Sequence, residues 1–366
     1  MKLRSLIFVA LLITVSGVTE EIKSQTLEEK VGQMILVGFR GTDIDENDRI
    51  VSDIREHNLG GVVLYSTDMQ TDDENRNIES PDQVSQLTAS LQEFADTPLF
   101  VAVDQEGGRV NRLDTGYGFE TTDSHRQLGV EEDEDYTRQQ AGRIAETLQE
   151  VGVNMNFAPV LDLYVNPANP VIGRLNRSFS SEPDVVAEQA SIFIKEHRDR
   201  NVINAVKHFP GYGSYAGEDH RSIPDVTESW DDVELEPYQQ LIDNNAVDIV
   251  MVSNVFNREL DEEYPASLST KIINDLLREE LQFDGVILAE SPQMEEITEE
   301  YGFEEGVRRQ FLAGADMLQF ANNLVYNENV VEEVIQIGVD LVESGEIPES
   351  QIEESYNRII NLKESL

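Results

Sequence analysis

Short apolar runs alternate with longer segments of helical period along most of the chain. The runs are rich in Val, Ile, Leu and Phe, and several are apolar at consecutive positions, which is typical of strands covered on both faces. Eight runs are the predicted strands: 32–39, 60–66, 98–104, 153–163, 201–209, 248–255, 284–290 and 315–321.

The segments between these runs place apolar residues at helical spacing. The expected helices cover 45–58, 81–96, 136–152, 183–200, 269–281 and 303–314. Strands that alternate with helices predict a parallel sheet, and eight such units favour an α/β fold with a single (β/α)8 TIM-type barrel over residues 21–366. An open doubly wound sheet is the weaker alternative, because no GxGxxG follows the first strand and no Pro/Gly/Ser-rich linker divides the chain.

The first 20 residues, approximately, have the pattern of a signal peptide. In MKLRSLIFVALLITVSG, Lys2 and Arg4 precede an apolar run that extends to about Val15, and small residues follow it. The sequence therefore predicts export to a periplasmic or extracellular location, with no stable membrane insertion after the leader is removed. The run is short for a membrane span, so an uncleaved anchor is the less favoured alternative.

Charge narrows the choice of partners. Lys and Arg total 27 against 72 Asp and Glu, a formal net charge of −45, while 39% of residues are hydrophobic, enough for a folded core. Such an acidic surface disfavours nucleic acid and anionic membranes as partners. We interpret it as adaptation to high salt, with an ordinary acidic protein as the alternative. The absence of cysteine excludes disulfides, thiolate metal sites and a cysteine nucleophile.

Polar residues collect where the predicted strands end. In a barrel these carboxyl ends meet at one mouth, where such folds place their chemistry. Any one of them alone is most simply an ordinary loop residue, but together they predict a site for a polar small molecule. The residues are Asp104, Glu106, Asp162, Lys207, His208, Asn254, Glu290 and Asn322.

Several strings along the chain resemble glycoside hydrolase family 3, in particular its single-domain bacterial β-N-acetylglucosaminidase branch. They are VDQEGGRVNR, NPANPVIGRLNRSFSSEP, KHFPGYG, GEDH and FDGVILAESPQM, with PASLS and YGFEEGVRRQFLAGADMLQFANN. The resemblance implies a (β/α)8 barrel and exo-hydrolysis of terminal β-linked N-acetylglucosamine. It also implies retention of configuration through a covalent glycosyl-enzyme intermediate and no metal or other cofactor. A β-glucosidase or β-xylosidase of the same family is the neighbouring alternative.

The resemblance implies a sugar-binding set. Its members are Asp104, Arg112, Arg177, Lys207 and His208. Their chemistry agrees with this role, because a carboxylate and cations supply the acceptors and donors that sugar hydroxyls need. For Arg112 or Arg177 alone, a solvated ion pair is the competing interpretation.

The resemblance also implies that His220 is the general acid/base. An imidazole titrates near working pH, so it can protonate a leaving oxygen and later accept a proton from water. The family places an aspartate two residues before this histidine, where this chain has Glu218, and Asp219 is a competing partner.

The aligned nucleophile is Glu290, where the family usually has an aspartate in Ser-Asp-Asp and this chain reads Ala289, Glu290, Ser291. The extra methylene moves the carboxylate by about 1.5 Å. Histidines common in the family are replaced by Tyr212 and Asn254. A hydrolase with an altered site and a glycan-binding protein without catalysis both remain open, and a purely structural module is least favoured. The sequence does not predict the oligomeric state.

Overall fold

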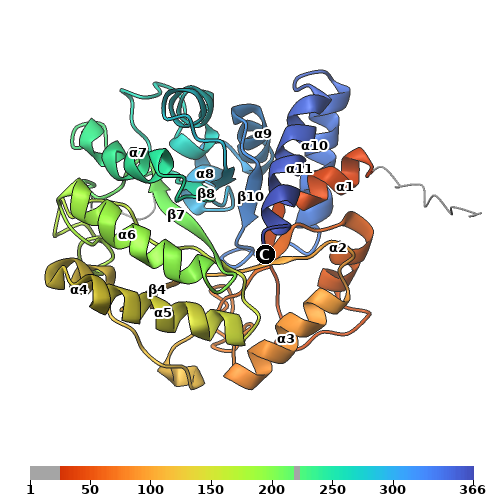
Figure 1. Ribbon diagram of the computed structural model, residues 1–366. Helices are drawn as coiled ribbons and strands as arrows, with labels where there is room; N and C mark the ends of the chain where they lie inside the picture. The colour runs from red at the N-terminus through yellow and green to blue at the C-terminus, as the bar shows by residue number, and fades with distance from the viewer. Residues whose placement is uncertain (1–24, 218–222) are drawn as a thin grey trace, which may run out of the picture.

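The computed structural model describes residues 25–217 and 223–366. In this part of the chain, parallel strands close a barrel in the order β1-β10-β9-β8-β7-β6-β3-β2, and helices surround it (Figure 1). The strands are β1 Ile35–Gly38, β2 Gly61–Val63, β3 Phe100–Val103, β6 Met155–Asn156, β7 Ile203–Phe209, β8 Ile249–Val252, β9 Val286–Ala289 and β10 Met317–Phe320. Each lies within one of the predicted runs, so the (β/α)8 barrel is confirmed.

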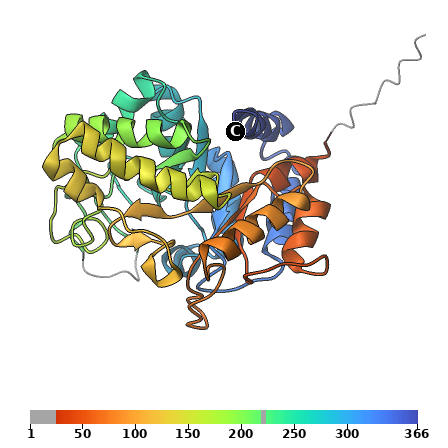
Figure 2. The ribbon, with the colours of Figure 1, turned by 60° about the horizontal axis from the view of Figure 1, so that its bottom comes forward.

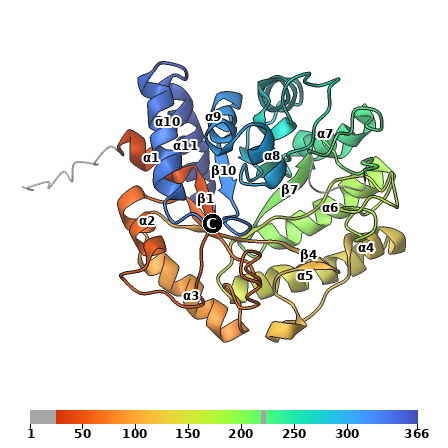
Figure 3. The same cartoon turned by 180° about the vertical axis from the view of Figure 1, so that it is seen from behind.

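The helices form the outer layer, which Figure 3 shows from behind. They are α1 Leu27–Gln33, α2 Arg49–His57, α3 Pro81–Glu93, α4 His125–Glu131, α5 Glu134–Glu150, α6 Pro183–Arg198, α7 Glu236–Asp243, α8 Glu295–Glu300, α9 Phe303–Ala313, α10 Val330–Glu343 and α11 Glu349–Lys363. Short 3-10 helices are also present: η1 Thr115–Tyr117, η2 Asp232–Leu235 and η3 Ala266–Leu268. The segment η4 Lys271–Glu280 is a π-helix. No helix among the described residues has an apolar stretch long enough to cross a membrane.

Local sequence signals explain where helices begin. At α3, the Ser80 hydroxyl accepts the Gln83 N–H at 3.2 Å, and Pro81 follows in the first turn, where a missing N–H costs nothing. At α1, Thr26 and Glu29 form a reciprocal capping box. These caps satisfy amides that the helices cannot pair internally, so the helix starts follow from the sequence.

The fourth strand is shorter than predicted. The apolar run covers 153–163, but regular pairing is limited to Met155 and Asn156. Pro159 lacks an N–H and cannot continue a strand ladder, and only an isolated bridge joins Val160 to Lys207 farther along. The remaining residues of the run leave the ladder and bring Asp162 to the mouth of the barrel.

The last residues of α11 lie against the amino ends of β1, β2 and β3, and Figure 2 marks the C-terminus beside this helix. The Lys363 ammonium is buried and donates at 2.7 Å to both Gln33 Oε1 and the Gly60 carbonyl. It also lies 4.8 Å from the centre of the Phe100 ring. Burial holds the pKa of Lys363 well below its ordinary value. Lys363 thus ties the end of α11 to the amino ends of the strands, whereas Asp104 and Glu290 follow the carboxyl ends of β3 and β9.

Candidate active site

Asp104, Lys207 and Arg112 form the first part of the site. Asp104 directly follows β3, and Lys207 lies in β7. The Lys207 ammonium donates to Asp104 Oδ1 at 2.7 Å, and an Arg112 Nη donates to Asp104 Oδ2 at 3.2 Å. Burial alone would raise the pKa of Asp104, but the charges of Lys207 and Arg112 outweigh it and lower this pKa to about 2. Asp104 is therefore an ionised acceptor at any physiological pH.

Glu106 pairs with two cations beneath this group. It lies in β4 (Gln105–Gly107), which forms a hairpin with β5 (Val110–Asn111). Its two oxygens accept from Arg177 at 2.7 and 2.9 Å, and Lys207 lies 2.8 Å from Oε1. Burial opposes ionisation, but Arg177 and Lys207 reverse the effect and hold the pKa of Glu106 well below its usual range. The two-point contact fixes the plane of the guanidinium.

His208 is oriented from both sides of its ring. Its Nδ1 lies 2.6 Å from Asp162 Oδ2, and its Nε2 lies 3.2 Å from an Arg177 Nη. Arginine can only donate, so Nε2 accepts and Nδ1 carries the hydrogen bonded to Asp162. The carboxylates of Asp104 and Glu106 thus pair with three cations, those of Arg112, Arg177 and Lys207, while Asp162 binds the His208 ring.

Glu290 directly follows β9, two strands around the barrel from β7. Its Oε2 accepts the Asn254 N–H at 2.7 Å, and its own carbonyl accepts from Gln310 Nε2 at 2.7 Å. The Asn254 side chain in turn donates to the Ser291 carbonyl at 3.1 Å. The half-buried carboxylate is therefore held by the Asn254 N–H after β8, while Gln310 of α9 fixes the backbone of Glu290.

Tyr212 lies between these two parts of the site. Its backbone N–H donates to Asp162 Oδ1 at 2.7 Å, and its ring meets the His208 ring edge-on at 6.2 Å. Burial raises the pKa of the Tyr212 hydroxyl, and the charge of Glu290 acts in the same direction. Glu296 in α8 is a second carboxyl in this region. Burial raises its pKa to about 7, again with a contribution from the charge of Glu290.

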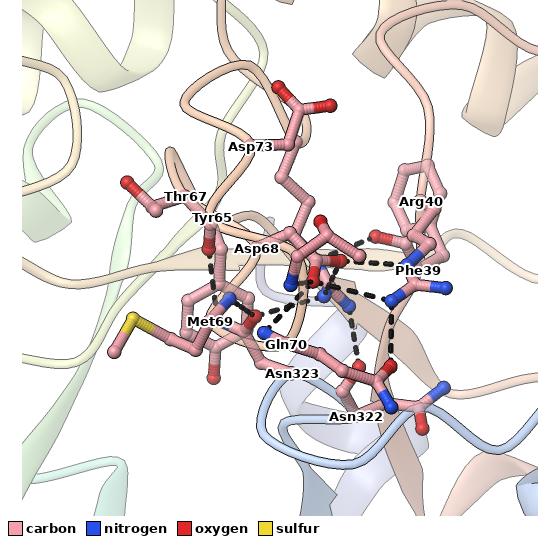
Figure 4. A network of polar contacts seen from close by, with 12 residues as sticks. Phe39, Arg40, Tyr65, Thr67, Asp68, Met69, Gln70, Asp73, Asn322 and Asn323 are labelled. Atoms are coloured by element: carbon pink, nitrogen blue, oxygen red, sulfur yellow. Dashed lines mark hydrogen bonds and ion pairs between the residues drawn. The ribbon is translucent and has the colours of Figure 1, made fainter.

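A polar network fixes the rim of the mouth beside Asp104 (Figure 4). Asp68 accepts from Arg40 at 2.7 Å and from Arg76 at 2.9 Å, and Asn323 accepts from the Met69 N–H at 2.8 Å. These contacts join the loops that follow β1, β2 and β10. Next to them, Gln319 donates to the buried Tyr65 hydroxyl at 3.1 Å, and Arg112 lies 5.9 Å from the centre of the Tyr65 ring.

The structure brings the five predicted sugar-binding residues into one contact network. They are Asp104, Arg112, Arg177, Lys207 and His208. It places Glu290 at the same mouth. Glu218 and His220 lie outside the described residues, and so does the predicted leader of residues 1–20.

From the sequence, Glu106 and Asp162 were predicted only as polar residues at strand ends, with no function. Charge counting could have found a role for Glu106. Three cations were assigned to a buried site against the single carboxylate Asp104, and buried cations require paired anions. The structure supplies this further anion as Glu106, which pairs with Arg177 and Lys207, while Asp162 orients the His208 ring.

The arrangement suits recognition of a neutral polyol. Ionised acceptors and fixed donors point into one mouth, and Glu290 offers a carboxylate at its side. Among residues 25–217 and 223–366, no group of His, Asp or Glu side chains has the geometry to hold a metal ion.

Comparison with known proteins identifies relatives along nearly the whole described chain. The family model described as "Glycosyl hydrolase family 3 N terminal domain" matches residues 26–362. The chain is 31% identical over 292 residues to a β-hexosaminidase of Tolumonas auensis, with 79% of this chain and 83% of that protein covered. It is 32% identical over 298 residues to a β-hexosaminidase of Nitrosomonas eutropha, with 79% and 80% covered.

A similar fold is found among solved structures. A glycoside hydrolase family 3 β-N-acetylglucosaminidase from Paenibacillus sp. str. FPU-7 superposes with a TM-score of 0.84 at 33% identity. The match covers 93% of this chain and 63% of that one, so the chain spans less than two thirds of that protein's length.

Proposed function

The chain belongs to glycoside hydrolase family 3, and on that premise we propose that it is an exported retaining exo-glycosidase that removes terminal β-linked N-acetylglucosamine. The relatives named above, β-hexosaminidases and a β-N-acetylglucosaminidase, support this substrate class. A cell-wall or chitin-type saccharide is the substrate we propose. The N-terminal leader pattern supports export.

In this proposal the terminal sugar binds against the paired charges. Asp104 accepts from sugar hydroxyls, Arg112, Arg177 and Lys207 donate to them, and His208 presents the edge of its ring to the sugar. The single observation that carries the proposal is the ion-pair network of Asp104, Lys207, Glu106 and Arg177, with contacts of 2.7 to 2.8 Å. These groups are held in place before substrate arrives, so binding requires little reorganisation.

Glu290 is the proposed nucleophile. One carboxylate oxygen forms a bond to the anomeric carbon as the bond to the leaving oxygen breaks, and His220 gives that oxygen its proton. Water then attacks the same carbon, His220 takes the proton from water, and the glycosyl ester breaks to release Glu290. Glu218 orients the imidazole. The roles of His220 and Glu218 rest on the sequence resemblance, since both lie outside the described residues.

Release of p-nitrophenol from the β-N-acetylglucosaminide, measured in molar salt, tests the proposal. We expect turnover in the wild-type chain and loss of kcat by about a thousandfold or more in Glu290→Gln, which keeps the shape but removes the nucleophile. Glu295→Gln is the matched control, because Glu295 is an exposed carboxylate close in sequence. It should retain wild-type kcat.

A folded wild-type protein that hydrolyses none of a panel of β-glycosides would reject the proposal. The panel should include β-glucoside and β-xyloside, because the sugar-binding groups above recognise hydroxyls that all three sugars share.

A second candidate is a glycan-binding protein without turnover. The observation that favours it is the glutamate at position 290, where the family pattern has an aspartate. This candidate predicts saturable binding of N-acetylglucosamine by calorimetry together with no hydrolysis, whereas the first predicts both binding and product.

A further inference from the structure

A buried carboxylate that the proposed mechanism does not use lies beneath the segment that follows β7. Glu234 in η2 is only 1% exposed. Its Oε2 accepts the Gly213 N–H at 3.1 Å. Its other oxygen, Oε1, is buried and makes no hydrogen bond of ordinary geometry among the described residues, although the Ser214 hydroxyl and N–H lie close enough to stabilise the charge. A carboxylate so placed is costly to bury, which calls for a reason beyond packing.

The segment passes Glu234 too closely for side chains. A Cβ on Gly211 would lie 2.7 Å from Glu234 Oε2, and one on Gly213 would lie 1.9 Å from the Leu163 carbonyl oxygen. Gly211 also has a φ of 129°, in the region that favours glycine. The backbone of 211–213 is therefore threaded between η2 and the loop after β6.

A second carboxylate holds the same segment from the other side. Asp162 accepts the Tyr212 N–H at 2.7 Å and the His208 ring at 2.6 Å. Consecutive amides, those of Tyr212 and Gly213, are thus bound by two different buried carboxylates. Nearby, the Trp230 indole donates to the Pro210 carbonyl at 3.1 Å.

We infer that Glu234 is a positioning residue that holds the backbone of residues 208–213, so that His208 and Tyr212 keep their places at the sugar site. Two successive amides anchored on separate carboxylates fix the orientation of the peptide group between them. The catalytic consequence of this inference rests on the proposed function, whereas the structural part does not.

The charge of this anchor changes near neutral pH. Burial raises the pKa of Glu234 to about 7, and the charge of Asp162 acts in the same direction. The Ser214 hydroxyl and the amides of Gly213 and Ser214 act against it. The titratable groups that face Glu234 are Asp162 and Tyr238 of α7, and burial raises the pKa of Tyr238 well above its ordinary value. Protonation of Glu234 weakens a charge-assisted hydrogen bond and loosens the segment.

Trp230 provides a direct reporter, because it is the only tryptophan in the chain and bonds to the segment through Pro210. We expect its fluorescence to show a transition near pH 7 in the wild type, and the same transition in Glu236→Gln, which removes an exposed carboxylate two residues away. Glu234→Gln should lack the transition. The fluorescence measurement needs no substrate. It therefore tests whether Glu234 holds residues 208–213 even if the protein hydrolyses no glycoside.

Kinetics supply the second readout. Glu234→Leu removes the acceptor altogether, and we expect kcat/KM to fall by about tenfold, as a displacement of less than 1 Å at the site would cause. The inference is overturned by a Glu234→Gln protein that keeps the wild-type fluorescence transition, or by a folded Glu234→Leu protein with wild-type kcat/KM. If Glu234→Leu does not fold, the fluorescence of Glu234→Gln decides.

Discussion

Glu106 supports the candidate site without being one of the proposed sugar ligands. Its carboxylate binds Arg177 at two points and lies 2.8 Å from Lys207, while only 1% of its surface is exposed. Removing its charge leaves Arg177 buried without its anion. A broken buried ion pair is far more costly than a broken exposed one, because the remaining charge cannot be solvated.

Glu106→Gln should therefore lower the free energy of unfolding by about 3 kcal/mol or more. Urea denaturation measures this loss. Glu305→Gln is the control, because Glu305 is a partly exposed carboxylate paired with Arg309 along α9 and its loss should cost less than about 1 kcal/mol. Equal losses of unfolding free energy in the two variants would show that the buried ion pairs of Glu106 contribute no more to stability than an ion pair near the surface.

Glu290 stands where the family pattern would place an aspartate, so the question is whether the surrounding residues fit the longer side chain. The Asn254 N–H holds the glutamate carboxylate at 2.7 Å, and an aspartate would withdraw from that contact by about 1.5 Å. We expect Glu290→Asp to lower kcat by about a hundredfold, because the surrounding residues fit the longer acid. A gain in kcat would indicate instead that Glu290 is a defect in an otherwise ordinary family site.

Among the elements, the eight strands were predictable because each lies in a largely apolar run, and all of their residues are buried. β9 shows this well: all four residues of Val286–Ala289 are buried. The fourth strand was predicted too long, since hydrophobicity continues past Pro159 where ladder pairing stops. Asp104 and Lys207 could be placed at one mouth by strand order alone. Glu106 lies in the β4–β5 hairpin, which no apolar run predicts, so its contacts with Arg177 and Lys207 could not be placed by strand order.

The layer between α6 and the barrel contains a buried neutral histidine. His197 Nδ1 lies 2.8 Å from the Phe193 carbonyl, to which it must donate, and Nε2 accepts from the Asn156 amide at 3.1 Å. Burial lowers the pKa of His197 to about 3. A proton on Nε2 would face the Asn156 N–H group, so the folded protein resists taking it up.

The unfolded chain binds this proton near pH 6.5, whereas the folded chain does so only near pH 3. Wild-type protein should therefore lose stability relative to His197→Gln as pH falls through this window. The difference in unfolding free energy should change by about 1.4 kcal/mol per pH unit between about pH 6 and 5. Denaturant titrations at several pH values measure it, and a constant difference would contradict the buried neutral state.

For the molecule as a whole, the net charge affects how stable the fold is at a given salt concentration. A chain with a formal charge of −45 repels itself when compact, and the screening length shortens from about 10 Å at 0.1 M salt to about 3 Å at 1 M. We expect the thermal unfolding midpoint to rise by roughly 5 °C between about 0.1 and 2 M NaCl. Scanning calorimetry in the two solutions tests this. An unchanged or lower midpoint would exclude adaptation to high salt.

In the proposed function, the carboxylate of Glu290 attacks a sugar that is bound against the pair of Asp104 and Lys207. The most direct test is reaction with a 5-fluoro N-acetylglucosaminyl fluoride, which forms the glycosyl ester faster than water breaks it, followed by peptide mass spectrometry. We predict a single sugar adduct on the peptide that contains Glu290, absent from Glu290→Gln. An adduct on a different carboxylate, or turnover of the reagent with no adduct, would contradict the role of Glu290 as nucleophile.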